Sequence, residues 1–216
     1  MPLCQPLIRY LKSPTLFGAI DRLPCLGTPV SDRTFEVFNP STGELLAELP
    51  DMGVAETGAA IDRAHATQPG WAALTARERS DMLWRWHQLI VDHADDLAAI
   101  LTAEMGKPLA EAKSEVSHAA AYLQWYAEEA NRIYGETIPA PSTDRRLLVI
   151  KQPIGVVGTI TPWNFPASMV ARKISPALAA GCTIVLKPAE QTPLVAGAMF
   201  ALAQQAGIPD GVVNLI

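Results

Sequence analysis

The chain has 216 residues, of which 49% are hydrophobic and 18% are charged, so it has ample apolar material for a core and is not of the disordered class. Acidic residues outnumber basic ones by 22 to 17, and the net charge of −5 argues against a dedicated nucleic-acid binder, which normally carries a basic patch. The three cysteines, Cys4, Cys25 and Cys182, are too widely spaced for a disulfide framework or a metal site, which indicates a reducing compartment.

The first residues, MPLCQPLIRYLKSP, contain no long apolar run and no small-residue cleavage site, so no secretory signal is expected. The most apolar stretches, such as ISPALAAGCTIVL, are too short and too interrupted to span a bilayer. The sequence therefore predicts a soluble, cytoplasmic protein without a membrane partner.

The first two thirds of the chain are predicted to hold a hairpin, several helices and a strand. Residues 1–34 form an irregular leader, because prolines interrupt every candidate element there. A hairpin is expected over 35–50, where two alternating runs flank the turn sequence NPSTG. Helical periodicity and end signals then predict helices over 54–68, from a capping box at Thr75–Glu78, through Leu97 to Gly106, and from Pro108 to Gly135. A loop over 137–142 and a strand over 145–152 complete a unit of residues 35–152.

The pattern changes after Pro153 to strand, helix, strand, helix, strand. The strands GVVGTI, CTIVLK and VVNLI are apolar, and the first two are expected to be buried. Apolar strands that alternate with helices are typical of a parallel, doubly wound sheet. The fold class predicted is therefore α/β, with residues 153–216 forming the first half of a Rossmann-like sheet behind a helical N-terminal region.

Two turns follow the first two strands at the edge where ligands bind in open α/β sheets. TPWNFP holds an asparagine between two prolines, and KPAEQ places Lys187 three residues before Glu190. Neither carries the glycine-rich dinucleotide fingerprint. A fixed ammonium and carboxylate suit the hydroxyls of a ribose, and the carboxylate would repel a 2′-phosphate, which favours NAD. The alternative is a solvated ion pair in a surface loop.

The segment GVVGTITPWNFPASMVARKISPALAAGCTIVLKPAEQTPL resembles the NAD(P)-dependent aldehyde dehydrogenase superfamily. Within it, EMGKPLAEAKSEV and RLLVIKQPIGVV resemble the succinate-semialdehyde dehydrogenase branch, and the similarity runs over residues 35–216. The resemblance implies that Asn164 helps to form the oxyanion hole, where a rigidly held N–H donor stabilises the charge that develops when a thiolate attacks the aldehyde. The alternative is a turn asparagine bonded to its own backbone.

The resemblance also assigns binding roles. The dinucleotide is expected at Asn164 together with Ile160, Thr161, Pro162 and Trp163, and its adenosine ribose at Lys187, Pro188, Ala189 and Glu190. The cofactor is expected to be NAD, with NADP possible, since the branch includes both. Arg172 is expected to reach the distal carboxylate of the substrate, because a guanidinium suits a carboxylate bidentately. The alternative places Arg172 on the helix surface beside Lys173.

The family's chemistry needs a nucleophilic cysteine and a glutamate general base, and neither motif occurs in this chain. Cys182 opens a strand and is expected in the core. The first hypothesis is therefore the N-terminal part of a dehydrogenase for succinate semialdehyde, or for glutarate semialdehyde as a rival, which is inactive by itself and forms a homo-oligomer at full length. The second is a catalytically dead, truncated chain that binds dinucleotide weakly or pairs with full-length subunits through residues 145–152.

The remaining candidates have structural interpretations. The four histidines are isolated on predicted helices, and no metal site is expected. Trp84 and Trp86 point to different helix faces, so one is expected to be packed and the other partly exposed.

Overall fold

The computed structural model describes residues 11–12 and 33–216. The predicted leader, with Cys4 and Cys25, lies almost wholly outside these residues. In the described part, the strands pair as two antiparallel hairpins and one three-stranded parallel sheet of order β5-β6-β7. The strands are β1 (Thr34–Phe38), β2 (Leu45–Pro50), β3 (Glu136–Ile138), β4 (Leu147–Val149), β5 (Val156–Ile160), β6 (Thr183–Lys187) and β7 (Val213–Leu215). The helices are α2 (Val54–Ala73), α3 (Ala76–Asp92), α4 (Ala94–Met105), α5 (Leu109–Ala130), α6 (Pro166–Ala179) and α7 (Leu194–Gln205).

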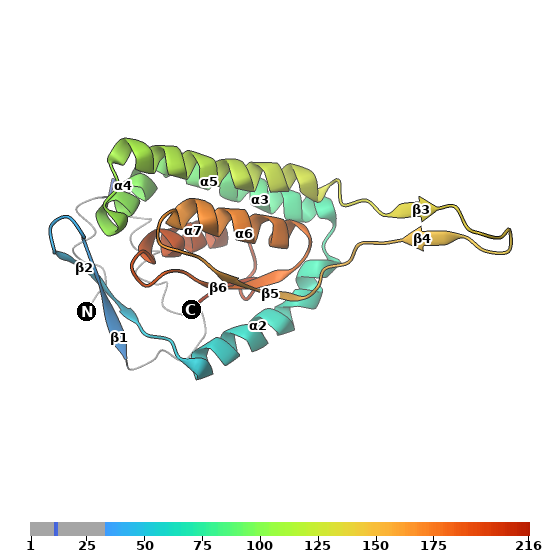
Figure 1. The fold of residues 1–216 in the computed structure, drawn as a ribbon, viewed down its shortest axis with the longest axis horizontal. Helices are drawn as coiled ribbons and strands as arrows, with labels where there is room; N and C mark the ends of the chain where they lie inside the picture. The colour runs from blue at the N-terminus through green and yellow to red at the C-terminus, as the bar shows by residue number, and fades with distance from the viewer. Residues whose placement is uncertain (1–10, 13–32) are drawn as a thin grey trace.

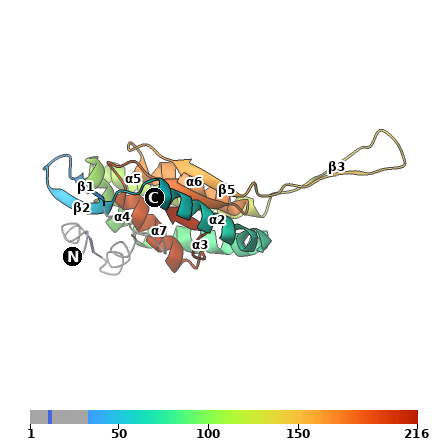
Figure 2. The ribbon, with the colours of Figure 1, turned by 90° about the horizontal axis from the view of Figure 1, so that it is seen from below.

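The elements form layers around the parallel sheet (Figures 1 and 2). Helices α6 and α7 connect the parallel strands and lie on one face of the sheet, while α2 packs on the other face. A further layer of α3, α4 and α5 covers α6 and α7. The α/β class and the parallel order of the three strands are therefore confirmed.

Several predicted helix ends are confirmed by their capping contacts. Thr75 begins α3 with a capping box, in which its hydroxyl accepts from the Glu78 N–H and the Glu78 carboxylate accepts from the Thr75 N–H. Gly106 ends α4 in the left-handed conformation, with φ +83°, and a Cβ there would lie 3.0 Å from Pro40 Cγ. Glycine is therefore required both by the backbone and by the approach of the β1–β2 turn.

Other predicted bounds are wrong for identifiable reasons. Helix α2 continues past Gln68 and through Pro69 to Ala73, because Trp71 is buried and its Nε1 donates to the Leu178 carbonyl at 3.1 Å. Helix α5 ends at Ala130 rather than at Gly135, and Pro108 is its N-cap rather than its first residue.

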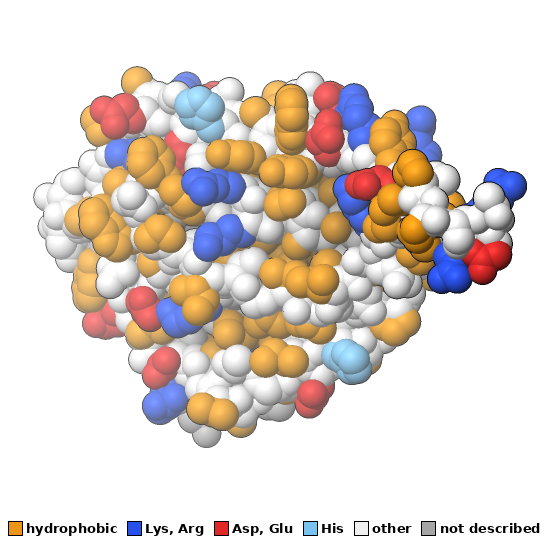
Figure 3. Space-filling view, turned by 45° about the vertical axis from the view of Figure 1, so that its right-hand side comes forward, with side chains coloured by type: hydrophobic (Ala, Val, Ile, Leu, Met, Phe, Trp, Pro, Cys, Tyr) orange, Lys and Arg blue, Asp and Glu red, His pale blue; other side chains and the backbone are white. Residues whose placement is uncertain are grey.

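The predicted loop over 137–142 overlaps strand β3, which pairs with β4 in a long hairpin that projects from the body (Figure 1). Gly135 lies at the base of this hairpin, where a Cβ would approach Val149 O to 2.3 Å. The hairpin carries exposed apolar side chains, visible in Figure 3, and Leu148 is 73% exposed. A segment with this composition is available for contact with another polypeptide.

Strand β5 was expected to be buried, and the structure corrects this. It lies at the edge of the three-stranded sheet, and Ile160 is 70% exposed. Strand β6 lies between two partners and is almost fully buried, as predicted, and Cys182 just before it is a buried core residue.

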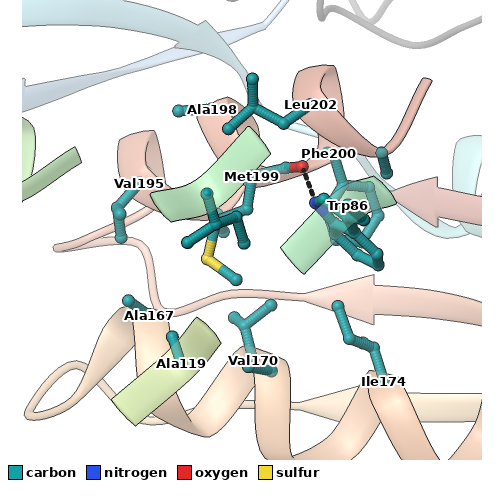
Figure 4. Close-up of a cluster of buried hydrophobic side chains, with 14 of the residues drawn as sticks. Trp86, Ala119, Ala167, Val170, Ile174, Val195, Ala198, Met199, Phe200 and Leu202 are labelled. Atoms are coloured by element: carbon teal, nitrogen blue, oxygen red, sulfur yellow. Dashed lines mark hydrogen bonds between the residues drawn. The ribbon is translucent and has the colours of Figure 1, made fainter. Parts of the chain in front are cut away.

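The core lies between the helical layer and the α6–α7 layer (Figure 4). Trp86 of α3 is fully buried, meets the Phe200 ring edge-on with 6.5 Å between ring centroids, and donates from Nε1 to Met199 O at 2.9 Å. Trp84 is 38% exposed, which confirms that the two tryptophans occupy different faces of α3.

Charged side chains of the helical layer meet both ends of α6 and α7. The carboxylates of Glu115 and Glu104 accept hydrogen bonds from the first N–H groups of α6 and α7 respectively. Arg79 donates to Ala179 O at the end of α6, and Arg85 donates to Ala206 O at the end of α7. Glu115, Arg79 and Arg85 each place a charge opposite in sign to the end of the helix dipole that they contact, and Glu104 places two acceptor oxygens at the N–H end of α7.

Candidate functional site

The turn after β5 is open to solvent on the side where a ligand could approach. Thr161 is buried and its N–H donates to Lys187 O at 3.2 Å, which ties the end of β5 to the end of β6. Trp163, Asn164 and Phe165 are exposed. Among the described residues, no partner hydrogen-bonds the Asn164 side chain, so the local turn bond considered as an alternative is not formed. The amide is free to donate to a ligand.

The turn after β6 lies beside the first one, because Ile160 and Lys187 are paired in the parallel register. Lys187 Nζ and Glu190 Oε1 form an ion pair at 2.5 Å, and both side chains are largely exposed. The hydrogen bond from Lys187 holds the pKa of Glu190 below its ordinary value. An exposed ion pair adds little stability, so this one can open at low cost. Lys187 and Glu190 can then hydrogen-bond to the hydroxyl groups of a ligand instead of to each other.

Glu115 of α5 holds the N-terminus of α6 from the inside of the protein. Its Oε1 accepts from the N–H groups of Ala167 and Ser168 at 2.9 and 3.1 Å. Its Oε2 forms a buried ion pair with Lys107. Helix α6 is therefore fixed at the end that follows the Asn164 turn.

Glu104 of α4 does the same for α7. Its two oxygens accept from the N–H groups of Leu194 and Val195 at 2.7 and 2.9 Å. Burial raises the pKa of Glu104 from 4.5 to about 8, while the two N–H donors act in the opposite direction.

The raised pKa of Glu104 predicts a pH dependence of stability. The folded protein holds this proton more tightly than the unfolded chain does, so the free energy of unfolding should fall as the pH rises from 4.5 to about 8. Glu104→Gln cannot ionise and should remove this fall, about 1.4 kcal/mol per pH unit at most. Urea unfolding at several pH values measures it, with Glu111→Gln on the exposed face of α5 as the control. Identical slopes for the wild type and Glu104→Gln would refute the assignment.

A groove of about 600 Å³ runs between α5 and α6 beside the Asn164 turn. It is mainly apolar, and its lining residues are Phe165, Ser168 and Met169 of the α6 end, with His118, Ala121, Tyr122, Trp125 and Tyr126 of α5. Arg172 is exposed and lies three residues beyond Met169 on α6, about 4.5 Å at the rise of 1.5 Å per residue.

The structure thus brings together some of the predicted residues and leaves others apart. The residue set 160–164 and the set 187–190 meet at one edge of the sheet, whereas Arg172 stands two turns along α6. Sequence reasoning missed Glu104, Lys107, Glu115 and the groove. Glu115 could have been noticed, because a carboxylate three residues from Ala112 and four from Ala119 lies on the apolar face of α5.

Within residues 11–12 and 33–216, no three His, Cys, Asp or Glu side chains gather as a metal site would require. In the same residues, no helix is long and apolar enough to cross a bilayer.

Comparison with known proteins places these features in a family. Residues 28–216 match the aldehyde dehydrogenase family. A Sinorhizobium fredii protein named as a probable NADP(+) succinate-semialdehyde dehydrogenase is 74% identical over the whole of this chain, which covers 44% of that protein. A glutarate-semialdehyde dehydrogenase of Pseudomonas putida is 58% identical over 85% of this chain and 38% of its own length. The crystal structure of an NADP-dependent Escherichia coli enzyme superposes with a TM-score of 0.91 at 52% identity, covering 95% of this chain and 43% of the other. The chain therefore spans less than half the length of these relatives.

Proposed function

The chain belongs to the aldehyde dehydrogenase family, and from this premise we propose that it supplies the N-terminal part of an enzyme that oxidises a small semialdehyde to its acid with reduction of NAD(P)+. The observation that carries the proposal is the open amide of Asn164, held at the carboxyl edge of a parallel sheet between a groove and a second polar turn. We place the reaction in a reducing compartment such as the cytoplasm, which suits a thiolate nucleophile.

The proposed role of Asn164 is to donate its side-chain N–H to the aldehyde oxygen as that oxygen becomes anionic. A donor fixed in advance stabilises the transition state without reorganising, and one such donor is worth about 3–4 kcal/mol. The attacking cysteine and the glutamate base are proposed to come from sequence beyond these 216 residues. The chain by itself is then expected to be inactive.

The residues at the two turns fit one side of a dinucleotide. Ile160 and Trp163 offer exposed apolar surface beside Asn164, and the exposed Lys187–Glu190 pair offers a donor and an acceptor to ribose hydroxyls. The bound dinucleotide would supply the hydride acceptor. Glu190 favours NAD, whereas the S. fredii relative is named for NADP(+), so both cofactors belong in the assay.

The substrate class is proposed to be a semialdehyde with a distal carboxylate. The groove offers apolar walls for a short methylene chain. Arg172 lies further along α6 than the Asn164 turn, so its guanidinium could bind a carboxylate at the far end of that chain. Arginine side chains on a helix lean toward its N-terminus, which here is the Asn164 end. Succinate semialdehyde is the first choice, and glutarate semialdehyde differs by one methylene, which is worth only about 1–3 kcal/mol of discrimination.

Replacing Arg172 with alanine is expected to raise KM for succinate semialdehyde about 10–100-fold, since a hydrogen bond to a charged group contributes about 1.5–3 kcal/mol. KM for butanal, which lacks the carboxylate, should stay within about threefold. Steady-state kinetics on the native protein that carries these residues measure both values. Lys173→Ala removes the neighbouring exposed cation and is the matched control. Equal effects on both aldehydes would contradict the assignment.

The exposed hairpin β3–β4 favours a second candidate function, a subunit-interaction module. Its apolar side chains, with Leu148 at 73% and Ile150 at 71% exposure, need a partner surface. We propose that this hairpin contacts another copy in a homo-oligomer, whether or not the chain reacts.

The intact mass of the native protein, followed by an assay with succinate semialdehyde and either dinucleotide, separates the two functions. A mass well above 23.2 kDa with dinucleotide reduction supports the dehydrogenase. A mass of 23.2 kDa, no reduction and co-purification with a longer subunit support the interaction module.

A further inference from the structure

The buried pair of Lys107 and Glu115 reaches the Asn164 turn as well as α6. Lys107 Nζ donates to the Asn164 backbone carbonyl at 3.3 Å and lies 4.4 Å from the centre of the Phe165 ring. The Lys107 and Glu115 side chains are only 7% and 1% exposed. One ion pair thus holds three peptide groups between Asn164 and Ser168, those that carry Asn164 O, Ala167 N–H and Ser168 N–H.

Helix capping alone would not need the lysine. A side-chain carboxyl group can cap a helix without a cation: Glu104 caps α7 through two N–H groups, and no cation pairs with its oxygens in the described residues. Burying a second charge is costly unless it is fully bonded. Besides pairing with Glu115, Lys107 donates a hydrogen bond to the Asn164 carbonyl. Its ammonium group also lies over the face of the Phe165 ring and makes a cation–π contact. Its contacts lie on both residues at the centre of the turn.

We propose that Lys107 and Glu115 are positioning residues that fix the Asn164 turn, so that the side-chain amide holds the direction needed by an oxyanion. The catalytic consequence of this arrangement rests on the proposed function. The fixing of the turn itself does not depend on that function. Catalytic groups must be held within about 0.5 Å of the productive geometry, and a 1 Å misplacement can cost about 10²-fold in rate. The amide of Asn164 has no side-chain partner of its own in the described residues, so its direction depends on the backbone that Lys107 holds.

The test uses four variants of the native protein. Lys107→Met removes the charge but keeps the apolar stem, and Lys107→Arg keeps the charge. Because Lys107→Met leaves Glu115 unpaired and could impair folding, the double variant Lys107→Met/Glu115→Gln removes both charges and keeps an oxygen to cap α6. Lys113→Met, which breaks the exposed ion pair with Asp95, is the matched control.

Two readouts are needed. In the double variant, hydrogen exchange at the backbone N–H groups of residues 163–165, 167 and 168 should accelerate about tenfold or more, while exchange in β6 stays unchanged. The kcat should fall about 10–100-fold with KM for the dinucleotide within about threefold. Lys107→Arg should restore both readouts to within about threefold of the wild type, and Lys113→Met should match the wild type.

The outcomes are separable. Unchanged exchange at residues 163–168 in the double variant overturns the inference, and so does an increase spread equally over the whole protein, which would show a general structural role. Local loosening with unchanged kcat overturns the catalytic consequence. If the wild type shows no dehydrogenase activity, the proposed function fails, while the exchange result still decides whether the pair fixes the turn.

Discussion

Replacing Asn164 with alanine is expected to lower kcat of the native protein about 10²–10³-fold, because the variant loses one donor to the developing oxyanion. KM for the dinucleotide should change by less than about threefold, since the backbone of the turn is held by Lys107 and by the Thr161–Lys187 hydrogen bond. Steady-state kinetics with saturating aldehyde measure the effect. Asn164→Asp keeps the shape but presents a negative charge, and should be at least as impaired.

Asn131→Ala is the control for this experiment. Asn131 follows α5 and its amide donates to Ser80, away from the two turns, so kcat should stay near that of the wild type. A fall of less than about threefold in Asn164→Ala would mean that the amide is not aimed at the reacting oxygen.

Replacing Trp86 with alanine should have the largest effect on stability. The side chain is fully buried, meets Phe200 edge-on and donates to Met199 O, so the variant leaves a large cavity and loses a hydrogen bond (Figure 4). A loss of about 3–5 kcal/mol in the free energy of unfolding is expected. At about 2–4 °C per kcal/mol for a chain of this size, Tm should fall by roughly 6–20 °C.

Trp84→Ala removes the same side chain from the exposed face of the same helix. Because Trp84 is 38% exposed, its loss should cost less than about 1 kcal/mol. Thermal unfolding followed by circular dichroism compares the two variants directly. Similar values of Tm would show that α3 does not pack on α7 as described.

Local signals predicted most of the elements. The capping box at Thr75, the left-handed Gly106 and the NPSTG turn each act within a few residues, so the sequence reveals them directly. The ends of α2 and α5 were wrong because distant contacts decide them. Trp71 holds α2 past Pro69 through Leu178, and Gly135 serves the hairpin rather than the helix end.

The site was only partly predictable. The resemblance pointed to both turns, and the apolar strands put them at one edge, which the register confirms. The supporting charges were missed because their partners are remote in sequence: Glu115 contacts Ala167, and Glu104 contacts Leu194. Periodicity marks such residues only as polar positions on an apolar face. The exposure of β5 could not be predicted either, because an apolar strand has the same sequence pattern at the edge and at the centre of a sheet.

The charges at the ends of α6 and α7 give these helices a polarity as well as a position. A helix docked backwards would set Glu115 against carbonyl groups, or Arg79 or Arg85 against N–H groups, with each mismatched end losing up to about 2 kcal/mol. The helical layer is synthesised before the two helices that it covers. Its side chains therefore stabilise α6 and α7 in one orientation only. In that orientation, the turns that precede α6 and α7 lie at the same edge of the sheet.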